Sequence, residues 1–487
     1  MQKSTIYPVN EVLNLEELAD IMGCNIGSFP STYLGLPLGA QHKSTEIWTG
    51  VIGKFEKRLA TWQMQYLSFG GRVTLINSVL DSLPTYYMAL LPMPSEVIEQ
   101  IDKIRRDFLW KGNREKHKFH LIKWEKVTQP KYQGGLGIKN LAAHNKSMMM
   151  KWLWRYNLED AGLWKEVIIA KHGRLNQWCS NITTLPYGVG LWKSIRMLWD
   201  TFDQNAYFEL GNGVLLKFWT DKWLGNITLQ EDFPDLFRIA QDPNSIIAAN
   251  REGINWDIRF RRNMHDWEVN DLVDLFARLQ HCHINLQAAD KLKWGHQKGV
   301  YTVKEGYQQL CSRNPVIANW PWKLIWRTKL PPKVVFFTWI ALYEACLTQD
   351  NIKKRKIQFP NRCYMCKKEV ETPRHLLLHC EVASELWSMF FCLSGINWTT
   401  PLTVKDAYES WSLWKVDKAI KKIWIMIPAC IFWCIWLERN KRCFDGESTA
   451  LGILKTRCTE NLFSWTNLYP AVNAEQLQDF TNSLALA

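Results

Sequence analysis

The stretch CYMCKKEVETPRHLLLHC, residues 363–380, holds three of the thirteen cysteines and two of the eleven histidines of a 487-residue chain. Cys363 and Cys366 are separated by two residues, so both thiolates can face one ion from a tight turn. Thr372 and Pro373 then predict a helix start, an N-cap followed by proline at the first helical position. His375 therefore begins a helix, and a ligand set of thiolates and imidazole suits tetrahedral zinc.

The spacing leaves the fourth ligand open between His379 and Cys380. On a regular α-helix, His379 lies about 40° around the axis from His375, whereas Cys380 lies about 140° away, so helical geometry favours the histidine. Thiolate is the stronger partner for zinc, and an irregular helix end would bring Cys380 within reach. Either choice gives four protein ligands, which predicts a structural zinc ion without an open catalytic position.

The composition indicates a large, basic chain. Its length predicts roughly three domains, and 60 Lys and Arg against 47 Asp and Glu leave a net charge of +13, which is compatible with a polyanionic partner. The first residues do not resemble a secretory signal, so we expect an intracellular location and reduced thiols. The short run KKRK at 353–356 fits either a nuclear address or a solvated face. The most apolar run, residues 423–437, contains Pro428 and falls short of the ~20 residues of a membrane helix, so we expect a buried helix and no membrane partner.

The hydrophobic pattern predicts an α+β fold that is mainly helical and multi-domain. Apolar residues recur every three or four positions from residue 44 onward, and a helix is predicted over 95–110. Asn212-Gly213 between two apolar runs predicts a β-hairpin near 207–219, and a second hairpin-like stretch covers 291–303. Helices return after residue 314. The middle of the chain is therefore predicted to be a mixed connector with β-hairpins.

A basic stretch with interleaved aromatic residues covers residues 103–139. It contains eleven Lys and Arg against three Asp and Glu, a local excess of eight positive charges. Cations that neutralise phosphates and rings on which bases stack are typical of a sequence-tolerant nucleic-acid surface, although a solvated helix face with core aromatics competes about evenly. The candidate nucleic-acid-binding residues are Lys103, Arg105, Arg106, Lys111, Arg114, Lys116, Lys118, Lys123, Lys126, Trp110 and Trp124.

An ordered set of motifs resembles the carboxy-terminal part of plant LINE-type (non-LTR) retrotransposon reverse transcriptases. The motifs are YLGLPLG (33–39), LSFGGRVTLINSVLDSLPTYYM (67–88), IRRDFLWKG (104–112), GGLGIKNL (134–141), KWLWR (151–155), GNGVLLKFWTDKWLG (211–225) and WLERNKRCF (436–444). The segment 320–387 looks like the zinc-binding domain of this family. The resemblance covers nearly the whole chain.

The resemblance implies both the ligands and the domains. The family pattern, C-x2-C followed by H-x4-C, implies the metal ligands Cys363, Cys366, His375 and Cys380 and leaves His379 outside. The implied domains are a remnant of the palm end and primer grip (1–43), a helical thumb-like basic region (44–160), a mixed connector (161–313), a small zinc-binding domain (314–400) and a helical tail (401–487).

The resemblance also implies that this chain is not a polymerase. Intact members carry a palm with a [YF]-x-D-D motif upstream of the region matched here, and this sequence contains no Asp-Asp dipeptide. We therefore expect a truncated, non-catalytic derivative with zinc as cofactor, RNA or single-stranded DNA as partner and no small-molecule substrate. The alternatives are a zinc-containing protein interaction scaffold and a decayed reading frame without a selected role.

Overall fold

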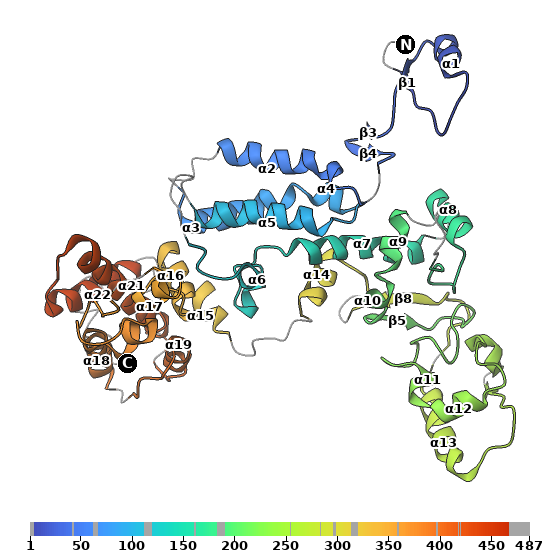
Figure 1. Ribbon diagram of the computed structural model, residues 1–487. Coiled ribbons are helices and arrows are strands. Elements are labelled where there is room, and N and C mark those ends of the chain that lie inside the picture. Colours follow the sequence, from blue (N-terminus) through green and yellow to red (C-terminus); the bar gives the residue numbers. More distant parts are fainter. Residues whose placement is uncertain are drawn as a thin grey trace. The chain divides into compact units, whose positions relative to one another are not determined.

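The computed structural model describes the chain except residues 1–3, 41–42, 62–66, 112–118, 160–161, 183–189, 254, 283, 296–298, 313–319, 358–359, 396–397, 417, 419 and 467–487. Figure 1 shows its helices and short strands along the chain. The chain divides into two compact units, each assembled from separate stretches. Unit 1 consists of Met1–Thr49, Thr85–Ile98 and Leu141–Arg313, and unit 2 of Gly50–Pro84, Glu99–Asn140 and Asn314–Ala487. The predicted α+β, mainly helical fold is confirmed, and every described strand lies in unit 1.

Unit 1 is built on the long helix α7 (Leu141–Leu158), which packs along α14 (Val303–Ser312). The buried Asn145 side chain of α7 accepts a hydrogen bond from Met93 N–H at 2.9 Å and donates to the carbonyls of Met88 and Leu91, each at 2.9 Å. The other helices of the unit are α1 (Leu15–Met22), α4 (Thr85–Met88), α8 (Leu163–His172), α9 (Leu191–Arg196), α10 (Trp199–Asp203), α11 (Leu229–Asp232), α12 (Pro234–Ile239) and α13 (Asp266–Gln280), with the short turns η1 (Glu46–Trp48) and η6 (Ile247–Asn250).

The strands of unit 1 form four two-stranded pairs. These are β1 (Thr5–Ile6) with β2 (Asn25–Ile26), β3 (Ser31–Tyr33) with β4 (Leu36–Leu38), β5 (Ala206–Glu209) with β8 (Lys291–Trp294), and β6 (Arg251–Glu252) with β7 (Asn255–Trp256). β1 and β2 are parallel, and the other pairs are antiparallel.

The stretch predicted as a hairpin near 207–219 contributes one described strand, β5, and β5 pairs with the distant β8. The reason lies in the buried carboxylate of Asp290. It accepts backbone N–H groups from Gly211 at 2.7 Å, Gly213 at 2.9 Å and Leu215 at 2.9 Å. The Asn-Gly turn therefore wraps around an acid from a distant segment instead of closing a local ladder. The second predicted hairpin, 291–303, stays a prediction, because residues 296–298 lie outside the described residues.

Unit 2 contains only helices among its described elements. The helix α5 (Ser95–Trp110), whose first four residues belong to unit 1, has the predicted limits. On α2 (Thr49–Thr61), Val51, Phe55 and Leu59 are buried, which agrees with the predicted spacing. The remaining elements are α3 (Phe69–Ser78), η3 (Leu80–Ser82), α6 (Trp124–Val127), η4 (Lys131–Gln133), α15 (Trp322–Trp326), α16 (Pro332–Leu342), α17 (Gln349–Lys353), η7 (His375–His379), α18 (Glu381–Ser394), α19 (Val404–Ser412), α20 (Lys421–Trp424), α21 (Ile427–Asn440), η8 (Lys441–Asp445) and α22 (Leu451–Thr466).

The apolar run at 423–437 forms the end of α20 and most of α21, both buried as predicted. Pro428 lies in the first turn of α21, where its missing N–H has no intrahelical partner to lose. α21 packs against α16, α18, α22 and η7, so it is the central helix around which the elements of the metal-binding stretch gather. In the described part of the chain, no helix combines the length and apolarity that a bilayer crossing requires.

Candidate metal centre

A tight turn presents the first two cysteines of the metal-binding stretch. The N–H of Lys367 donates to the carbonyl of Cys363 at 2.8 Å, and the N–H of Cys363 donates to the carbonyl of Glu369 at 2.7 Å. Lys367 closes the turn with a left-handed φ of 57°. The N–H of Lys368 donates to Cys366 Sγ at 3.5 Å. The backbone that positions the sulfurs thus also hydrogen-bonds to one of them.

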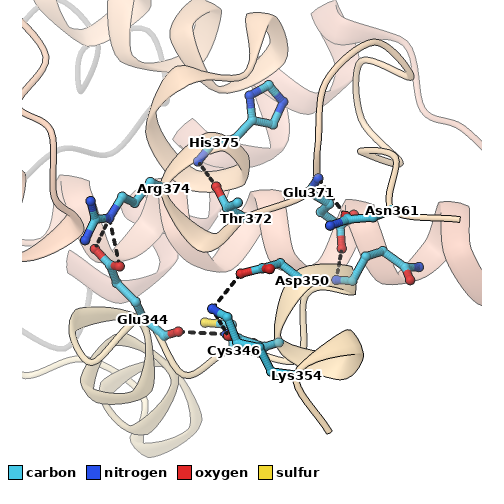
Figure 2. A network of polar contacts seen from close by, with 11 residues as sticks. Glu344, Cys346, Asp350, Lys354, Asn361, Glu371, Thr372, Arg374 and His375 are labelled. Carbon is cyan, nitrogen blue, oxygen red and sulfur yellow. Dashed lines mark hydrogen bonds and ion pairs between the residues drawn. The ribbon is translucent and has the colours of Figure 1, made fainter. Parts of the chain in front are cut away.

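The other two side chains of the cluster are His375, the first residue of the π-helical turn η7, and Cys380, which directly follows this turn. Thr372 Oγ1 accepts a hydrogen bond from His375 N–H at 3.1 Å, as expected of the predicted N-cap, and Figure 2 shows this contact. The N–H of Cys380 then donates to the carbonyl of His375 at 2.7 Å, an i→i+5 bond that widens the turn. A wider turn brings positions five apart onto one face, whereas a regular α-helix would align positions four apart.

The four residues implied by the sequence motif lie together. Cys363 Sγ is 3.9 Å from Cys380 Sγ, Cys366 Sγ is 3.3 Å from His375 Nε2, and all four donor atoms lie within 4.8 Å of one another. Cys363 and Cys380 are buried, and Cys366 and His375 are partly buried. His379, the alternative that regular helical geometry favoured, is exposed. The π turn therefore brings Cys380, and not His379, next to the other three donor atoms.

These close contacts change the proton affinities of the side chains. Hydrogen bonding to the sulfur of Cys363, together with that of Cys366, raises the pKa of His375 to about 9. Hydrogen bonding to Cys380 and burial raise the pKa of Cys363 to about 12, while the hydrogen bond from Cys363 lowers the pKa of Cys380.

The donor set is chemically selective. Three sulfurs and one imidazole nitrogen exclude ions such as calcium and magnesium, which prefer oxygen, and match a soft or borderline ion with four ligands. Because every ligand comes from the protein, a bound ion would have no open position for a substrate. The arrangement fits a structural metal centre.

A buried carboxylate ties the metal-binding turn to two helices. The side chain of Glu371 accepts a hydrogen bond from the backbone N–H of Tyr364 at 3.2 Å and from that of Gln349 in α17 at 3.0 Å. Arg439 in α21 donates to the same carboxylate from Nη2 at 2.7 Å. The N–H of Glu371 in turn donates to Asn361 Oδ1 at 3.1 Å, and Figure 2 shows Asn361 beside Glu371. Glu371 therefore fixes the turn between Cys363 and Cys366 against the rest of unit 2.

Two further arginines brace the same region. Arg442 donates to the carbonyl of Met365, inside the C-x2-C turn, at 2.8 Å, and to Glu438 at 2.8 Å. Arg374, next to His375, donates from Nε to both carboxylate oxygens of Glu344 at 2.8 Å, a pair visible in Figure 2. Both ends of the metal-binding stretch are thus held by charge-assisted hydrogen bonds.

Comparison with known proteins assigns this region. Residues 301–387, which include all four clustered side chains, match the family described as zinc-binding in reverse transcriptase. The chain carries the zinc-binding domain of a reverse transcriptase. The predicted relationship to retrotransposon reverse transcriptases is thereby confirmed.

The similarity reaches well beyond the zinc-binding domain. The Arabidopsis thaliana protein named "Putative ribonuclease H protein At1g65750" is 27% identical over 435 residues, which cover 85% of this chain and 67% of that protein. The Arabidopsis thaliana protein named "Uncharacterized mitochondrial protein AtMg00310" is 23% identical over 147 residues, which cover 29% of this chain and 93% of that protein. The similarity to the first of these proteins therefore extends well outside residues 301–387.

The predicted nucleic-acid-binding residues occupy different environments. Lys103 and Lys123 are exposed, and Arg106, Lys111 and Lys126 are partly exposed. Arg114, Lys116 and Lys118 lie outside the described residues.

Three of the predicted residues are buried. Arg105 is 0% exposed and forms ion pairs with Asp81 at 2.6 Å and with Asp102. Trp110 and Trp124 are buried in the core of unit 2. A guanidinium enclosed between two carboxylates cannot reach a phosphate, so Arg105 is not part of the proposed surface. Trp124 does not line the pocket described below, whereas Trp110 does.

The sequence reasoning missed two features of unit 2. One is the buried pair of Glu371 and Arg439. Arg439 lies within the recognised motif WLERNKRCF, but no spacing in the sequence reveals Glu371 as its partner. The other is a second cluster of cysteines, Cys430, Cys434 and Cys458. The spacing of Cys430 and Cys434, one helical turn apart, was the available signal, whereas Cys458 comes from another helix.

Proposed function

We propose that this chain is a zinc-stabilised nucleic-acid-binding protein, derived from a LINE-type retrotransposon reverse transcriptase, that binds RNA or single-stranded DNA without polymerising. The ion of the metal centre is zinc, held by Cys363, Cys366, His375 and Cys380. It contributes folding energy to unit 2, on the order of 10 kcal/mol in small zinc peptides. The zinc-binding domain supplies a rigid base, and the binding surface lies on the basic stretch before it.

The observation that carries this proposal is an aromatic pocket in unit 2. It has a volume of about 560 Å³ and is lined by Phe69, Arg72, Trp110, Phe119, Leu121, Phe336 and Leu347. Phe119 belongs to the basic stretch and is 41% exposed at the pocket. A pocket of this size admits a planar group such as a nucleobase, and base-to-ring stacking contributes about 1–3 kcal/mol per base in single-strand binding.

The cations near Phe119 give the pocket the charge that a phosphate backbone requires. The guanidinium carbon of Arg355 lies 4.8 Å from the centre of the Phe119 ring, and Arg355 Nη2 donates to the carbonyl of His120 at 3.2 Å. Exposed Lys123 follows in the same stretch. Stacking in the pocket and neutralisation along the stretch are the two parts of a sequence-tolerant single-strand site.

The proposed lack of polymerase activity is supported by the chemistry of two-metal catalysis. That reaction needs clustered carboxylates around two cations, and the sequence contains no Asp-Asp dipeptide. Purified chain supplied with a primed RNA template, deoxynucleotides and magnesium should give no extension above a protein-free control. Extension that co-purifies with the chain would overturn this part of the proposal.

Salt dependence tests the binding itself. Fluorescence anisotropy with a labelled single-stranded RNA and a DNA of the same sequence should show affinity falling steeply between roughly 50 and 200 mM salt, because bound phosphates release counterions. Binding that is absent, or unchanged over that range, would reject the nucleic-acid reading. It would leave a protein interaction scaffold as the remaining function for the zinc-binding domain.

A further inference from the structure

A second group of sulfurs lies in unit 2, outside the zinc-binding stretch. Cys430 and Cys434 stand one turn apart on α21, and Cys458 faces them from α22. All three side chains are buried, with residue exposures of 0%, 2% and 0%. Their Sγ atoms lie within 4.8 Å of one another. Three sulfurs therefore converge on one point in a region closed to solvent.

Two hydrogen bonds involve these sulfurs. The Cys430 thiol donates to the carbonyl of Cys458 at 3.3 Å, and Asn461 Nδ2 donates to Cys434 Sγ at 3.4 Å. The three sulfurs nevertheless face one another within one buried cluster. A cation placed between them would be surrounded by soft donor atoms.

We propose that Cys430, Cys434 and Cys458 bind a second, thiolate-seeking metal ion. Among the described residues, the cluster holds three cysteines and no histidine, a donor set that suits a three-coordinate soft ion, for which monovalent copper is the leading candidate. Zinc would need a fourth donor, and the amide of Asn461 is the neighbouring side chain that contacts a sulfur. On binding, each thiol that becomes a ligand loses its proton to solvent, and no electron is transferred.

The position of this cluster gives the second ion a structural consequence. α21 carries Arg439, and η8, which follows it directly, carries Arg442; these side chains brace Glu371 and the C-x2-C turn of the first site. An ion that joins α21 to α22 would hold the helix from which Arg439 extends and to whose end the turn with Arg442 is attached. This inference does not depend on nucleic-acid binding, because it concerns only the packing of two helices.

Metal counting on the full chain tests the inference. Protein purified under reducing conditions is titrated separately with zinc and with monovalent copper against a competing chelator, and bound metal is measured by mass spectrometry. We expect two equivalents of bound metal in the unmodified chain and one equivalent in C363S/C366S, which keeps the second site. C434A should also retain one equivalent, while C392S, which changes the exposed Cys392, should retain two.

The two metals distinguish the identity of the second ion. Loss of a copper equivalent in C434A identifies the second ion as monovalent copper. Loss of a zinc equivalent identifies it as zinc, and a substitution of Asn461 then tests whether this residue is the fourth donor. Cobalt titration of C363S/C366S adds a measurement that does not depend on the folding of C434A, because thiolate ligation gives intense charge-transfer absorption. A single equivalent in the unmodified chain, with no cobalt-thiolate band in C363S/C366S, would overturn the inference.

Discussion

Glu371 and Arg439 are separated by 68 positions in the sequence, yet their side chains form an ion pair at 2.7 Å that is almost completely buried. Glu371 also receives the backbone N–H of Tyr364, the residue after the first cysteine of the metal centre. Arg439 lies in α21, beyond the stretch that matches the zinc-binding family. The structural support of the metal centre therefore includes a helix that the family match does not cover.

Replacing Glu371 with glutamine should destabilise unit 2 by about 3–5 kcal/mol, because it leaves the Arg439 guanidinium buried without its counter-charge. The same variant should release zinc faster to a chromogenic chelator, since the C-x2-C turn loses its anchor. Urea unfolding and zinc-release rates measure both effects. The matched control is K455A, which breaks the exposed pair with Glu385 and should cost about 1 kcal/mol or less. Equal effects of E371Q and K455A would contradict the proposed bracing role.

Histidine substitutions in η7 distinguish the ligand from its neighbour. H375A should lose the zinc ion, because Nε2 is one of the four converging donor atoms. H379A should keep the full metal content and an unchanged unfolding midpoint, because His379 is exposed and is not one of the four converging residues. Metal content measured after dialysis against a weak chelator checks both variants. Loss of zinc in H379A would mean that the helix closes in the regular α geometry.

Local patterns made some elements predictable and others not. The limits of α5 follow from an amphipathic period that neighbouring residues determine. The pairing of β5 with β8 does not follow from any local pattern. The Asn-Gly signal near Gly213 is local, whereas the acid that organises the turn, Asp290, is distant in sequence. Long-range contacts leave no local signature in the sequence.

The metal centre shows the same limit within a few residues. The residue types and the C-x2-C spacing predicted a zinc site, but regular helical geometry pointed to His379. The i→i+5 bond between Cys380 and His375 reverses that preference, and only the family resemblance anticipated it. Arg105 shows the converse case: a cation in a basic stretch is indistinguishable in sequence from one that pairs with Asp81 in the core.

Acid should weaken unit 1 through Glu268, in the first turn of α13. Hydrogen bonds from Arg262 and from the backbone of His265 lower the pKa of Glu268 from its ordinary value of 4.5 to about 2. A lowered carboxyl pKa stabilises the folded state fully above pH 4.5, and this contribution is lost as the pH falls towards 2. The thermal unfolding midpoint of the unmodified chain should therefore fall more over this pH window than the midpoint of E268Q. D274N, which changes an exposed acid of the same helix, should follow the unmodified chain. Parallel declines in E268Q and the unmodified chain would exclude the carboxylate as the cause.

Phe119 provides the sharpest test of the aromatic pocket. Removing its ring in F119A should weaken single-stranded RNA binding by about 5- to 100-fold, because one stacked base contributes roughly 1–3 kcal/mol. The salt dependence should keep its slope, since no phosphate contact is removed. F444A is the matched control, because Phe444 is a 76%-exposed phenylalanine of the same unit away from the pocket. K123A should instead reduce the slope while changing affinity only modestly at high salt. If F119A and F444A bind equally well, stacking in this pocket plays no part in recognition, and the basic stretch acts through charge alone.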